Sequence, residues 1–118
     1  MEVFYINQIQ WKIYYVSSQS HYLRDRTGEV KLATTDIKRK IIFVNCTLKG
    51  DILYKVLLHE ICHAAIESYG LMEDIHRVVI PEYWFISEEW LCNFISDYAL
   101  TIISLANSII RPNSKYSS

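Results

Sequence analysis

The stretch Lys55-Val-Leu-Leu-His-Glu-Ile-Cys-His-Ala64 lies near the middle of a chain of 118 residues. Apolar residues recur in and around it at three- and four-residue spacing, which predicts an amphipathic helix from Ile52 to about Tyr69. Asp51 is a suitable N-cap for this helix, and Gly70 suits its C-terminal cap. The helix is the most strongly patterned element of the sequence, so the fold prediction starts from it.

Strands are predicted before this helix. Residues 3–16 are rich in β-branched and aromatic side chains, and apolar and polar residues partly alternate over residues 9–13. This pattern favours a strand pair, although short apolar runs would also fit an initial helix. Residues 24–29 read as a turn around Gly28, and Ile41–Asn45 is a β-branched and aromatic run typical of a strand.

A second helix is predicted near the C-terminus. Residues 71–86 are irregular or hold a short helix, with Pro81 as a breaker, and Ser87 can cap a last helix that begins at Glu88 and ends before Arg111. The expected fold is therefore α+β, with a small antiparallel or mixed sheet packed on the motif helix and the C-terminal helix. We expect a single domain over residues 1–111 and a flexible tail over residues 112–118.

The composition is that of a folded domain without an obvious polyanionic partner. Hydrophobic residues make up 51% of the chain and charged residues 21%, and 12 basic against 13 acidic residues leave a formal charge of -1. This balance gives no reason to expect nucleic-acid binding. The N-terminus lacks the features of a secretory signal, and three cysteines without a C-x-x-C pair argue for reduced thiols. A cytoplasmic location is the resulting expectation.

The most apolar window, residues 91–110, is long enough to cross a bilayer. Asn93, Asp97 and Asn107 interrupt it, and a carboxylate well inside a membrane is costly. We therefore expect a core helix and no membrane contact, with membrane association as the alternative.

The motif helix carries the residues of a metal site. Residues four apart lie on one helix face, so His59 and His63 can direct two imidazoles at one metal ion. Glu60 can reach a metal-bound water without being a ligand itself. Zinc lowers the pKa of such a water, and a carboxylate can take its proton during attack on a carbonyl. Two histidines in an apolar helix that lacked a metal would have to be hydrogen-bonded core residues.

A zinc site needs a third protein ligand, and the sequence offers three candidates. His76 follows the motif by thirteen residues. Glu89 lies in the predicted last helix with Asn93 four residues later on the same face, and a His, His, Glu set is a known zinc ligand type. Glu88 is the alternative to Glu89, and both could instead stabilise the helix N-terminus. His76 is also the first candidate for stabilising the oxyanion, ahead of Tyr83 and Tyr69.

The combination V-L-L-H-E-I-C-H-A and, some 25 residues later, E-E-W-L-C-N-F resembles the ImmA/IrrE-type metallopeptidases of phages and mobile elements. That resemblance, over roughly residues 41–100, implies a zincin-like fold with His59, His63 and Glu89 as Zn²⁺ ligands and Glu60 as general base. SprT-like proteins are a second resemblance, through the strand before the helix, but their third ligand is a later histidine. Substrate backbone can add to an edge strand beside the motif helix. Ile41–Asn45 is the candidate, and an internal strand fits it equally.

Two functions follow as hypotheses. The first is a cytoplasmic zinc metallopeptidase of a phage or mobile element, which hydrolyses a peptide bond in a protein substrate such as a repressor or host factor, with Glu60 activating a zinc-bound water. The second is a catalytically inactive zincin-fold protein that serves as a zinc-stabilised protein-binding module.

Overall fold

The first sixteen residues form a β-hairpin in the computed structural model, which describes residues 1–111 of the chain. Strands β1 (Glu2–Ile6) and β2 (Ile9–Val16) pair antiparallel, with Ile6 opposite Ile9. The two residues between them, Asn7 and Gln8, both have positive φ, as a two-residue type I′ turn requires. The predicted strand pair is therefore confirmed, and the alternative of an initial helix is wrong.

The sheet has four strands in the order β1-β2-β4-β3. Strand β4 (Ile41–Asn45) runs parallel to β2, and β3 (Ala33–Asp36) pairs antiparallel with β4. The sheet is mixed, so the predicted α+β class is confirmed. Because β4 lies between β2 and β3, the prediction that Ile41–Asn45 offers a free edge is wrong, and the alternative of an internal strand is confirmed. The edge strands are β1 and β3, and the short A-T-T-D sequence of β3 gave no strand signal by itself.

Helix α1 (Gly50–Ser68) is the predicted motif helix. Its N-cap is Lys49 rather than Asp51, which lies in the first turn, where a carboxylate faces the positive end of the helix dipole. At the other end Gly70 has φ +67°. The Leu71 amide donates to the Ile66 carbonyl at 2.8 Å, the closing hydrogen bond of a Schellman cap.

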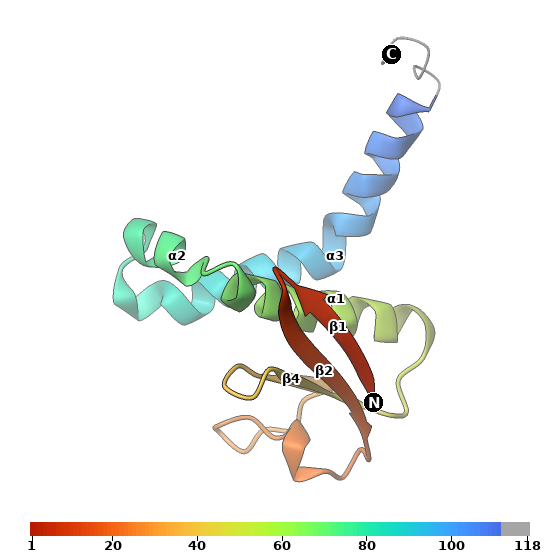
Figure 1. The fold of residues 1–118 in the computed structure, drawn as a ribbon, viewed down its shortest axis with the longest axis vertical. Coiled ribbons are helices and arrows are strands. Elements are labelled where there is room, and N and C mark those ends of the chain that lie inside the picture. The colour runs from red at the N-terminus through yellow and green to blue at the C-terminus, as the bar shows by residue number, and fades with distance from the viewer. Residues whose placement is uncertain (112–118) are drawn as a thin grey trace.

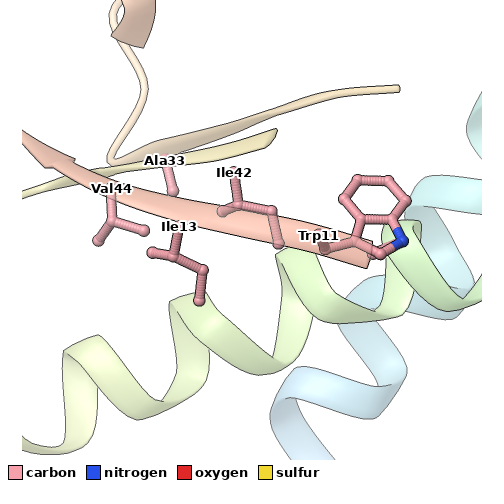
Figure 2. Packing of buried hydrophobic residues seen from close by; sticks show 6 residues of the cluster. Trp11, Ile13, Ala33, Ile42 and Val44 are labelled. Carbon is pink, nitrogen blue, oxygen red and sulfur yellow. The ribbon is translucent and has the colours of Figure 1, made fainter. Parts of the chain in front are cut away.

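One face of α1 packs on one face of the sheet, as Figure 1 shows. In Figure 2 the side chains of Ile13, Ile42 and Val44 point from the strands toward this helix. Ala64 meets them from the helix side and is fully buried. Burial of each large apolar side chain contributes about 1.5–3 kcal/mol, so this cluster holds the motif helix on the sheet.

The segment between β2 and β3 covers the opposite face of the sheet over β4 and β3. The ring of Tyr22, in a 3-10 turn η1 (His21–Leu23), stacks on Phe43 with 4.4 Å between ring centroids. The predicted turn follows, with Gly28 at φ +84° and the Asp25 carboxylate accepting from the Thr27 and Glu29 amides. This segment leads the chain into β3.

Helix α3 (Trp84–Ile110) begins earlier than expected. A short helix α2 (Met72–Val78) and a 3-10 turn η2 (Pro81–Tyr83) precede it. Ser87 therefore lies inside α3, and the prediction that it caps this helix is wrong. Pro81 stands at the start of η2, because proline is favoured in a first helical turn, where its missing amide would have no partner.

The two halves of α3 differ in burial. The first half runs along α1, whereas every residue from Leu100 to Arg111 is exposed, and this half projects away from the sheet and α1 in Figure 1. The prediction that residues 91–110 form a core helix is thus wrong for the second half. The segment Pro81–Ile110 is long and apolar enough to cross a membrane by length and composition. The predicted tail, residues 112–118, lies outside the described residues.

Candidate metal site

Helix α1 directs two imidazoles to one point. His59 and His63 lie one turn apart, and their Nε2 atoms are 3.2 Å from each other. Both side chains are mostly buried, because α1 lies between the sheet and α3. Burial of two unpaired imidazoles would be costly, so the environment must supply partners. The partners come from α3.

Glu89 completes a triangle of ligand atoms with the two histidines. Its Oε1 atom lies 2.7 Å from His63 Nε2, and its Oε2 atom lies 3.5 Å from His59 Nε2. Ligands bound at about 2.05 Å to a tetrahedral zinc ion lie about 3.3 Å from one another. The three observed separations lie on both sides of this value, although not all to one Glu89 oxygen, and one ligand atom of each residue lies within 4.8 Å of the others. The three residues could therefore hold a metal ion such as zinc. These are the residues predicted as ligands.

Glu88 takes a different place from Glu89. Its Oε2 atom contacts His63 Nδ1, on the side of the ring opposite the ligand triangle. A carboxylate in this position accepts the Nδ1 proton and leaves the Nε2 lone pair for a metal. The two neighbouring glutamates, between which the sequence could not choose, therefore contact different atoms of the histidines. Glu89 faces the Nε2 atoms of His59 and His63, and Glu88 contacts the Nδ1 atom of His63.

Glu60 is the one buried carboxylate beside the triangle, with 8% of its surface exposed. The Thr35 hydroxyl donates to its Oε1 atom at 2.7 Å, and its Oε2 atom lies 3.8 Å from His59 Nε2. One oxygen is thus held by β3, and the other is free to accept a proton near the metal position. Sequence reasoning missed Thr35, because the contact joins residues 25 apart and β3 was not predicted.

The site is electronegative when no cation is bound. Three carboxylates surround His63; burial disfavours its charged form, but the hydrogen bond with Glu88 and the charges of Glu60, Glu88 and Glu89 outweigh this and raise the pKa of His63 to about 9. A proton therefore occupies this histidine at neutral pH in the absence of metal. A divalent cation would replace that proton and balance the carboxylates.

The cluster opens into a cleft of about 1140 Å³. One side of the cleft is β3, from Ala33 to Asp36, and the segment before it, residues 21–32, also contributes to the lining. The other sides are α1 and the first half of α3. Strand β3 has β4 on one side and no strand on its other edge among residues 1–111. Asn93, predicted to support the site from the face of Glu89, also lines the cleft. An extended chain laid along β3 would therefore pass the metal position.

His76 is not brought to this cluster. It lies on α2, where its ring stacks on Trp84 with 3.6 Å between centroids, and it is not among the described residues that line the cleft. Tyr69 and Tyr83, the other predicted oxyanion donors, also lie outside that lining. The geometry gives His76 a packing role between α2 and α3 and no contact with the site.

Cys62 and Cys92 lie close together in the interface of α1 and α3. The Cys92 thiol is fully buried, and its hydrogen bond with Cys62, together with burial, raises the pKa of Cys92. Both thiols therefore lie in the packing between the two helices. Cys46 is exposed and is not among the described residues that line the cleft.

Comparisons of the chain with protein-family models, with curated proteins and with solved structures return no match. The resemblance to ImmA/IrrE-type metallopeptidases therefore stays a prediction that depends on the motifs alone. The functional argument depends on the geometry of His59, Glu60, His63 and Glu89.

Proposed function

We propose that this protein is a zinc-dependent metallopeptidase that hydrolyses a peptide bond in a protein substrate. The observation that carries the proposal is the triangle of His59, His63 and Glu89, set at zinc-ligand separations beside the buried carboxylate of Glu60. A purely structural zinc site uses four protein ligands, whereas this cluster supplies three and opens into a cleft.

The residues of the site divide the work of hydrolysis. Zinc, when bound, would supply a Lewis acid that lowers the pKa of water and polarises a carbonyl. Glu60 would accept the proton of the attacking water and later pass it to the leaving amine. Thr35 keeps the Glu60 carboxylate in place, and Glu88 keeps His63 in the tautomer that binds metal.

The substrate is proposed to bind as an added strand on β3. A backbone in that position would find unpaired amides and carbonyls of an edge strand and would cross the cleft in front of Glu60. This mode of binding uses main-chain groups, so it suits a locally unfolded segment of a protein. A repressor or host factor of a phage or mobile element is the substrate class predicted from the family resemblance.

The test is Glu60→Gln in the full chain, loaded with zinc and incubated with a peptide library whose cleavage is read by mass spectrometry. We expect cleavage to fall by about 10²–10⁴-fold while zinc stays bound, because the variant loses only the proton acceptor. Glu67→Gln is the matched control, since Glu67 is another α1 carboxylate but pairs with Lys40 outside the cleft.

Two results would overturn the proposal. One is a zinc-loaded wild-type protein that cleaves nothing in the library, and the other is a Glu60→Gln variant as active as the wild type. Either would favour the alternative hypothesis, a zinc-stabilised binding module without turnover.

A further inference from the structure

The second half of α3 presents an apolar surface that α1 does not reach. Seven large side chains in this half are each 51–62% exposed. Leu100 lies on the polar side of the helix, and the other six are Tyr98, Ile102, Ile103, Leu105, Ile109 and Ile110. No charged residue occurs between Asp97 and Arg111. Contiguous exposed apolar surface of this kind marks an interaction site.

The apolar side chains of this half share one side of the helix. At 3.6 residues per turn, Ala99 and Ala106 lie along the middle of that side, with the large side chains on both flanks. The polar residues Thr101, Ser104, Asn107 and Ser108 gather on the opposite side, with Leu100 among them. The helix is therefore amphipathic where it leaves the body of the protein, and small residues seven apart allow another helix to approach closely.

This apolar side continues the face that α1 covers in the first half. Cys92 and Ser96 face α1, where Cys92 is buried and the Ser96 hydroxyl donates to the Lys55 carbonyl. The same helix side, followed outward, carries Ala99 and Ile103. Helix α1 packs antiparallel on the first half of α3. Among residues 1–111, no helix packs in this way on the second half.

We propose that this surface binds a second copy of the chain, through pairing of the outer halves of α3, residues 98–110. Asp97 and Arg111 lie seven residues before and after Ser104, so they are on the polar side of the helix, away from the pairing surface. Asp97 already has a partner in its own chain, because its Oδ1 atom lies 4.0 Å from Lys55 Nζ. The pairing surface itself therefore carries no charge that would oppose a second copy of the same surface.

The size of the surface fits a dimer. A minimal stable interface buries roughly 500 Å² from each partner, and six large side chains, each more than half exposed, bring together surface of that order. A lipid bilayer fits less well, because the thirteen residues after Asp97 span only about 20 Å of a hydrocarbon core of about 30 Å. The polar side also lacks the basic residues with which interfacial helices bind anionic lipids.

Sedimentation velocity of the full chain over the micromolar range tests the proposal without reference to zinc. We expect the wild type to form dimers. Ile102→Glu or Leu105→Glu should raise the dissociation constant of the dimer at least about 100-fold, because each places one unpaired charge from each copy in the interface. Ser104→Glu, on the polar side, is the matched control and should stay within about threefold of wild type. Circular dichroism checks that all three variants keep their helix content.

Arg111→Gln is a second control, because Arg111 lies seven residues after Ser104 and therefore on the same polar side of the helix. Its dissociation constant should stay within about threefold of wild type. A loss of dimers in either control would overturn the assignment of the pairing surface to the apolar side. A wild type that is monomeric at high micromolar concentration overturns the proposal, as does one that floats with vesicles of phosphatidylcholine and phosphatidylglycerol instead of dimerising.

Discussion

The two halves of α3 have similar apolar content but opposite surroundings. The first half presents Glu88, Glu89 and Cys92 to α1 and contributes to the metal site, while the second half is exposed from Leu100 to Arg111. Hydropathy alone would make the outer half the more buried one. The difference shows that an apolar helix becomes core only where another element covers it. It also shows that the first half packs on α1 although it carries two carboxylates, because these face histidines.

The largest effect expected of the inner half concerns the third ligand. Glu89→Ala removes the one α3 oxygen pair that faces both Nε2 atoms. Loss of a residue that only orients a metal ligand lowers metal affinity by up to about 100-fold. Because Glu89 is proposed as a ligand itself, we expect zinc affinity to fall by more than this. Competition with a chromophoric chelator measures this, with Glu82→Gln in η2 as control. Undiminished affinity would mean that Glu89 is not a ligand.

The free energy of unfolding of the metal-free protein should depend on pH, with an effect nearly as large as that of Glu89→Ala on zinc binding. The pKa of His63 is about 9 in the folded chain and about 6.5 when unfolded, so the protonated form favours the folded state. This contribution, about 3 kcal/mol, is fully present below pH 6.5 and is lost as the pH rises toward 9. Urea unfolding in the presence of a chelator should show stability that falls over this window. A flat profile would remove the link between His63 and the α3 carboxylates.

Glu88→Gln should have a smaller effect than loss of a ligand. The variant keeps a hydrogen-bond acceptor beside His63 Nδ1 but loses the charge, so zinc affinity should fall about 10–100-fold. The decline of stability with pH should also become shallower, because the pKa of His63 is no longer raised as far. If Glu88→Gln weakened zinc binding more than Glu89→Ala, the assigned roles of the two glutamates would be reversed.

The smallest effect is expected in the outer half. Leu105→Ala at a concentration where the chain is monomeric should change the free energy of unfolding by no more than about 0.5 kcal/mol, because Leu105 is exposed. Ile42→Ala, in the core beneath α1, should cost about 2–5 kcal/mol under the same conditions. Comparable losses for both variants would show that the outer half is packed in solution.

The sequence predicted the parts of the structure that local patterns govern. Spacing in the motif helix placed His59 and His63 on one face, and β-branched runs located β2 and β4. It could not place β3, because Ala33-Thr-Thr-Asp36 becomes a strand only through its pairing with β4. It also could not separate Glu88 from Glu89, since that choice depends on the rotation of α3 against α1. His76 was a reasonable candidate by chain distance, but α2 directs its ring onto Trp84.

Titration of the metal-free full chain with zinc at neutral pH, measured by isothermal titration calorimetry, tests the central claim most directly. The account predicts one zinc ion bound per chain, with proton release because His63 is protonated before binding. It also predicts that binding is lost in His59→Ala and in His63→Ala. The account would be contradicted if the wild-type chain bound no zinc. It would also be contradicted if both His59→Ala and His63→Ala still bound zinc.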